Sequence, residues 1–234
     1  MAQLGGVLKK NNKDSAGGIL GNIQSRIAGN RGSTGLSNDD IVAGLKEALN
    51  KGTTNAAQQL SRPDGFFRDA AIKILMPPEA QKVETRLRAL GMGRQVDEAI
   101  LSMNRAAEDA AKEVAPVFLN AIKSMSISDA VGILRGGDQA ATLFLKNATS
   151  VELTQKFRPI IEASLAKVNA TRLWNTVFTN YNRFSAEKVN PDLNAYVTER
   201  ALAGLFHYVG VEEQKIRTNP AARSTELLRK VFAQ

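Results

Sequence analysis

The chain has 234 residues, of which 43% are hydrophobic and 23% charged, with a single histidine and no cysteine. This is the balance of an ordinary globular protein that is long enough to bury one large core. The lack of cysteine excludes disulfides, thiolate metal sites and cysteine nucleophiles, and the single histidine leaves one imidazole for any histidine-dependent site. No stretch approaches the roughly 18 consecutive apolar residues of a membrane-spanning helix, and the N-terminus lacks the pattern of a secretory signal.

The formal net charge of +8 is unevenly distributed. Residues 1–35 contain five Lys and Arg residues against one Asp, and the charge of the remaining residues is spread thinly. No stretch combines clustered cations with interleaved aromatic residues, as a nucleic-acid-binding surface requires. The sequence therefore argues against nucleic acid as a partner, and a basic helical module that contacts nucleic acid is only an alternative.

Residues 1–35 differ in composition from the rest of the chain. They hold eight of the 18 glycines, among many Asn and Ser residues. Such a composition cannot bury enough apolar surface to offset its ordering entropy. We predict a flexible tail over 1–35 and one compact helical domain over 36–234.

Local signals place several helices in the first half of this domain. A helix is predicted over 37–60, because a serine at its start fits the N-cap and two aspartates follow. A turn follows at 63–65, and alternating apolar residues before two prolines predict a short extended segment near 71–76, too short to build a sheet. Further helices are predicted over 78–90, between a proline and a glycine stop, and over 94–114.

Local signals of the same kinds place the helices of the second half. Ser126 and Asp129 predict a capped helix that ends at two glycines, after which Asp138 begins the next one. Thr149 with Glu152 predicts another helix start, and this helix contains Pro159. An aromatic-bearing helix, a long helix over 190–217 and a short last helix from Ser224 follow. The result is an all-α domain of eight or nine helices.

The helix over 190–217 is apolar on nearly every side, with charged residues interleaved. A helix of this kind must be surrounded by protein or lipid, and its charges favour protein. We therefore predict that it is buried at the centre of the domain and that its charged groups need partners.

Three hydrogen-bonding residues interrupt the alanine-rich helix over 94–114. If this helix is covered on one face, Arg105 belongs to a solvated ladder of charges; if both faces are covered, it is a buried ion that needs partners. The central helix offers such partners. The candidate polar cluster is Asn104, Arg105, Glu108, Glu199, Glu213 and Arg217.

This cluster has a structural and a functional interpretation. A buried network would fix the register of the helices, whereas carboxylates with perturbed pKa values in a cleft would act as general acid and base or bind a divalent cation. The arginines beside the carboxylates argue against a metal. We predict a structural network, with no metal and no cofactor.

Three other features have weaker functional interpretations. His207 is expected to be a neutral core histidine, because Arg200 lies on the same side of its helix. The Arg-Gly-Gly-Asp sequence at 135–138 lacks the full phosphate-loop pattern and is interpreted as a helix stop followed by an N-cap. Trp174, Phe178 and Tyr181 form one stripe that is more typical of core than of an apolar pocket.

The chain resembles a known family through a set of short motifs. They lie at 44–49, 63–66, 104–108, 129–130, 132–134, 136, 140–142, 156–157, 159 and 191–232. From Leu36 to the C-terminus the sequence is similar to the bacterial proteins of domain of unknown function 4197, although His207 and Tyr208 stand where aliphatic residues are expected. The resemblance implies no activity. It does imply a periplasmic or envelope protein whose relatives begin with a secretion or lipoprotein signal, which Met1 replaces here.

These observations favour a soluble helical envelope protein that binds an unknown protein partner or a small apolar ligand without catalysis. The main alternative is an enzyme, or a ligand- or ion-binding protein, that uses the buried Glu, Arg and Asn residues. An enzyme needs a solvent-accessible cleft that converges on Glu108, Glu199 or Glu213, whereas a scaffold needs only a satisfied network. The sequence does not indicate an oligomeric state.

Overall fold

The computed structural model describes residues 37–167, 170–184, 186, 188, 192–219, 225 and 229. The chain divides into two units, Met1–Ser37 and Asn38–Gln234, and the second unit contains the helical fold. The predicted tail over 1–35 lies outside the described residues. So does nearly all of the short helix predicted from Ser224.

The described residues form α-helices and two short 3-10 turns, and none of them lies in a β-strand, which confirms the all-α class. The elements are α2 (Asn38–Ser61), η1 (Pro78–Ala80), α3 (Gln81–Ala89), α4 (Gly93–Ala110), η2 (Ala111–Glu113), α5 (Val114–Ser124), α6 (Ile127–Arg135), α7 (Ala140–Ala166), α8 (Ala170–Phe184) and α9 (Leu193–Thr218). Residues 73–77, within the segment predicted to be extended, lie in no helix and pair with no strand.

Some predicted helix boundaries are confirmed, whereas the helix start predicted at Thr149 is wrong. Ser126 and Asp129 form a reciprocal capping box at the start of α6, and Gly91 adopts a left-handed φ of 81° after α3. Thr149, however, lies inside α7 and begins no helix. Its buried hydroxyl donates to the carbonyl of Leu145 at 2.6 Å, so the side chain is satisfied within the helix. The single helix α7 therefore replaces the two helices that were expected to meet at Thr149.

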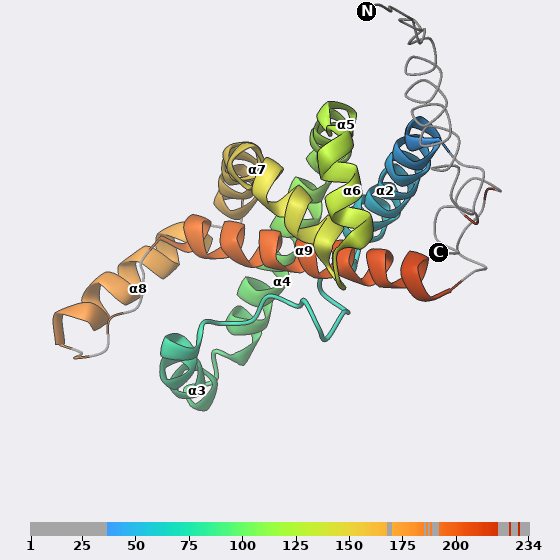
Figure 1. Cartoon of the computed structure of the whole chain (residues 1–234). Coiled ribbons are helices and arrows are strands. Elements are labelled where there is room, and N and C mark those ends of the chain that lie inside the picture. Colours follow the sequence, from blue (N-terminus) through green and yellow to red (C-terminus); the bar gives the residue numbers. More distant parts are fainter. Residues whose placement is uncertain are drawn as a thin grey trace, which may run out of the picture. The chain divides into compact units, whose positions relative to one another are not determined.

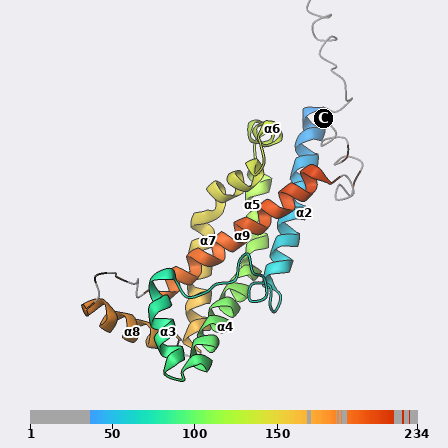
Figure 2. The same ribbon diagram turned by 90° about the horizontal axis from the view of Figure 1, so that it is seen from below.

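The long helix α9 lies at the centre of the domain (Figures 1 and 2). It packs along α7 and α2 and also contacts α4 and α8. Most of its aliphatic residues are buried, with Leu205 only 1% exposed. The prediction that protein surrounds it on all sides is wrong, because one stripe that includes Ala203, His207 and Gln214 is exposed.

One glycine lets the loop between α2 and η1 pack closely against α9. A Cβ atom at Gly204 would lie 2.7 Å from Cε1 of Phe66 and 3.2 Å from Cβ of Ile72. The Phe66 side chain is completely buried. Its ring therefore fits against α9 because position 204 has no side chain.

Gly204→Ala is expected to lower the free energy of unfolding by about 1–3 kcal/mol, because the added methyl group overlaps the Phe66 ring in a packed core. Gly210→Ala on the same helix is the matched control. Its Cβ would meet nothing closer than the Thr142 hydroxyl at 3.7 Å, and alanine favours helix by about 0.5–1 kcal/mol. Denaturant unfolding measures both variants. Equal stability of the two would contradict the close packing at Gly204.

Candidate functional site

Asn104 supplies the hydrogen bonds that the extended segment lacks. Its Oδ1 accepts from the backbone N–H of Ile74 at 2.9 Å, and its Nδ2 donates to the Ile74 carbonyl at 2.8 Å. The same Nδ2 donates to the carbonyl of Ile100 in its own helix. The amide therefore replaces a neighbouring strand and satisfies both backbone groups of a buried residue. This explains how a short extended segment persists without a sheet.

Glu108 holds the preceding turn in a similar way. Its buried Oε1 accepts from the backbone N–H groups of Phe66 at 3.1 Å and Phe67 at 3.2 Å. Its Oε2 accepts from Arg105 at 2.6 Å, and the other end of that guanidinium donates to Asp64 at 2.7 Å. We call Asn104, Arg105 and Glu108 the loop anchor, because together they bind the segment from Asp64 to Ile74.

The turn has the backbone conformation that this arrangement requires. Asp64 adopts a left-handed φ of 65°, and a Cβ atom at Gly65 would lie 2.5 Å from the carbonyl oxygen of Gln59. Only glycine fits there without a backbone shift. The Pro-Asp-Gly turn predicted from the sequence therefore depends on the left-handed backbone of Asp64 and on the missing side chain of Gly65. The loop anchor adds hydrogen bonds to it.

Arg105 is neither fully solvated nor fully buried. Its side chain is 41% exposed and pairs with both Glu108 and Asp64. The hydrogen bond from Arg105 to Glu108 raises the pKa of the guanidinium, which burial alone would lower. The ladder neighbour Asp109 pairs instead with Lys112. Arg105 is thus a partly exposed cation that pairs with the buried carboxylate of Glu108.

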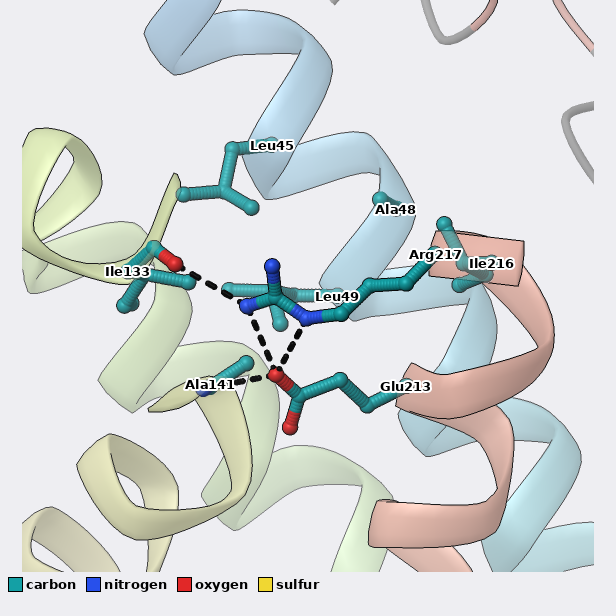
Figure 3. Close-up of a pocket in the computed structure, with 8 residues that line it drawn as sticks. All are labelled: Leu45, Ala48, Leu49, Ile133, Ala141, Glu213, Ile216 and Arg217. Atoms are coloured by element: carbon teal, nitrogen blue, oxygen red, sulfur yellow. Dashed lines mark hydrogen bonds and ion pairs between the residues drawn. The ribbon is translucent and has the colours of Figure 1, made fainter. Parts of the chain in front are cut away.

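A second polar group fixes the C-terminal part of α9 (Figure 3). Glu213 accepts from the backbone N–H groups of Ala141 at 3.1 Å and Thr142 at 2.8 Å, and from the Thr142 hydroxyl at 2.7 Å. Arg217 pairs with Glu213 at 2.8 Å and donates to the carbonyl of Ile133 at 2.9 Å. We call Glu213 and Arg217 the helix anchor.

The helix anchor binds the N-terminal end of α7 and the C-terminal end of α6. A carboxylate is favourable at the start of α7, where N–H groups lack partners, and a guanidinium is favourable at the end of α6, where carbonyl groups lack them. The N-cap predicted at Asp138 is therefore wrong. Gln139 occupies that position with a left-handed φ of 70° and no capping hydrogen bond from its side chain, and Glu213 supplies the acceptor from a distant helix.

The six residues of the candidate cluster do not form one network in the described structure. Three belong to the loop anchor and two to the helix anchor, and each group has its own partners. Glu199 lies apart from both and is exposed on α9. The helix anchor borders a cavity of about 20 Å³, which holds about one water molecule.

The other candidates are also located. His207 is exposed, so its predicted core position is wrong. Trp174 and Phe178 are buried on α8 with their ring centroids 4.2 Å apart, and Tyr181 lies 6.3 Å from Phe178. These rings pack against one another.

A groove of about 870 Å³ between α7 and α9 is the feature that the sequence analysis missed. Residues of the turn before α7, the first turns of α7 and the exposed stripe of α9 line it: Gly137, Asp138, Gln139, Ala140, Thr142, Leu143, Lys146, Ala203, Phe206, His207, Gly210, Val211 and Gln214. The signal in the sequence is the spacing of small and polar residues along one face of α9. We call it the α7–α9 groove.

Within the described residues, no three His, Asp or Glu side chains are grouped as a metal site, and every buried polar side-chain atom has a hydrogen-bond partner. No single described helix is long and apolar enough to cross a membrane; the bent pair Gly93–Ser124 and Ile127–Arg135 reaches that length and hydropathy only together. The buried carboxylates of Glu108 and Glu213 accept hydrogen bonds from backbone N–H groups and from arginines.

Fold and site together define a helical domain in which two buried carboxylates accept hydrogen bonds from backbone groups and an open groove lies between α7 and α9. The chain belongs to the family described as Protein of unknown function (DUF4197), whose model matches residues 35–233. Comparison with curated proteins and with solved structures gave no match.

Glu108→Ala is expected to lower the free energy of unfolding by about 3 kcal/mol or more, because it leaves two buried N–H groups and Arg105 without their acceptor. Arg105→Ala is expected to lower it by about 1 kcal/mol, since half-exposed ion pairs contribute little. Denaturant unfolding gives both values.

The control for this pair is Glu199→Ala, an exposed carboxylate on α9 that is expected to change stability by less than about 0.5 kcal/mol. If Glu108→Ala unfolds at the same denaturant concentration as the Glu199→Ala control, Glu108 does not have the structural role assigned to it.

Proposed function

We propose that this protein is a non-catalytic binding domain of the cell envelope, which recognises a protein partner or an apolar ligand. One observation carries the proposal: the oxygens of Glu108 and Glu213 are occupied by backbone N–H groups and arginines. A general acid or base must reach a substrate atom, directly or through one water. Carboxylates bound in this way support a structural role.

The location of the hollows supports binding over catalysis. The cavity beside Glu213 has room for about one water and none for a substrate. The α7–α9 groove is lined by neither Glu108, Glu199 nor Glu213. Its volume of about 870 Å³ lies within the range of ligand sites, roughly 300–1,000 Å³. A binding surface that is separate from the buried charges is what a recognition domain requires.

The envelope location rests on the family resemblance, which implies relatives with secretion or lipoprotein signals. The basic, glycine-rich composition of residues 1–35 is compatible with a tether between the domain and the envelope. Fractionation of the source cells tests this part of the proposal: the native protein is expected in the envelope fractions, and its recovery with cytosolic proteins would contradict the location.

Native mass spectrometry of the protein purified from its own host tests the binding role. A protein or an apolar molecule retained at a fixed ratio is the expected result. A retained divalent ion or polar metabolite that is lost in Glu108→Gln or Glu213→Gln would instead support the enzyme or ion-binding alternative. Wild-type protein treated with denaturant and refolded serves as the ligand-free reference.

A further inference from the structure

The two walls of the α7–α9 groove are antiparallel helices in a fixed register. Glu213 near the end of α9 binds the first turn of α7, and Arg158 in the second half of α7 pairs with Asp192, the N-cap of α9, at 2.6 Å. Between these two contacts, Lys146 of α7 and His207 of α9 both line the groove. The α7 wall thus carries a lysine and the α9 wall carries a histidine.

The groove has the features of a site for a helix. Its α9 wall runs from Ala203 to Gln214, which is about three turns. Small residues at Ala203 and Gly210 leave space for the backbone of a partner to approach closely. On the α7 wall Leu143 is 58% exposed. An amphipathic helix that places its apolar face in a groove is a common form of recognition.

Charge selects between possible partners. Lys146 is exposed and forms no ion pair with any residue that the structure describes. Asp138, in the turn before α7, is the one carboxylate that lines the groove. A second copy of this chain would bring a net charge of +8 toward a chain of the same charge. The lining carries one cation and one carboxylate, so the preference for an acidic partner over self-association rests on the net charge of the chain.

We propose that the α7–α9 groove binds an acidic amphipathic helix of a partner protein, with the apolar face of that helix on Leu143 and Phe206 and an acidic side chain at Lys146. This inference rests on the proposed function and specifies the class of partner.

Two designed peptides of about four helical turns serve as probes. Both carry leucines along one face; one has glutamates on the other face and the second has lysines there. Fluorescence anisotropy with the full chain measures both affinities. The glutamate peptide is expected to bind about tenfold more tightly, because like charges at Lys146 oppose the lysine peptide.

Substitutions of exposed residues test whether the groove is the site. Lys146→Glu is expected to weaken the glutamate peptide about fivefold and to strengthen the lysine peptide. Ala203→Trp fills the groove from an exposed position and is expected to abolish binding of both peptides. The matched controls are Lys51→Glu and Ala148→Trp, which change exposed residues outside the groove and are expected to bind like the parent.

Three results would overturn the inference. Equal affinities of the two peptides would remove the acidic preference, and binding that survives Ala203→Trp would place the site elsewhere. A dimer of the parent chain that Ala203→Trp dissociates in light scattering would make the groove a self-association surface. If neither peptide binds at millimolar concentration the inference also fails, whereas the ligand retained in native mass spectrometry decides the proposed function independently.

Discussion

A carboxylate is stable in a protein interior only where hydrogen-bond donors replace the water it has lost. The described part of this domain contains two such carboxylates, Glu108 and Glu213, and the arrangement of its helices depends on them. Glu108 accepts hydrogen bonds from the backbone N–H groups of the turn after α2. Glu213 accepts them from the backbone N–H groups at the start of α7. Each also pairs with an arginine of its own helix. In both cases a side chain on a rigid helix determines the position of a less regular segment.

The segment between α2 and η1 shows how hydrogen bonds to buried side chains can fix an irregular part of the chain. It lies between α4 and α9, and the loop anchor holds it from the α4 side. From the α9 side, Tyr196 donates to the carbonyl of Leu75 at 2.8 Å and Tyr208 donates to Asp69. The hydrogen bond from Tyr208 lowers the pKa of Asp69, which favours the charged acceptor. With the Phe66 ring against Gly204, polar and apolar contacts fix one conformation of an irregular segment.

The sequence predicts those parts of this structure whose causes are local. The capping box of Ser126 and Asp129 lies within one turn of helix, and the prediction was confirmed. The start of α7 could not be predicted in this way, because its acceptor is Glu213, 72 residues beyond Ala141. Asn104 and Glu108 were selected because they interrupt an alanine-rich helix. Their partners are backbone groups of a distant turn, and no pattern of side chains indicates such partners.

Periodicity also misplaced the exposed side of α9. Apolar residues on nearly every side of α9 predict a continuous apolar surface and a core position for His207. Small residues such as Ala203 and Gly210, however, add little apolar area and leave a hollow on the helix surface. A helix can therefore be central in a fold and still present one stripe to solvent.

The two anchors and the groove are connected through α9. The helix anchor sets the distance between α7 and α9 at one end of the groove, and the pair of Arg158 with Asp192 sets it near the other end. Because packed helices resist continuous deformation, the width of the groove follows from these contacts. The buried charges thus need no contact with a ligand to influence recognition. The role of these buried charges is to hold α7 and α9 in the register that forms the α7–α9 groove.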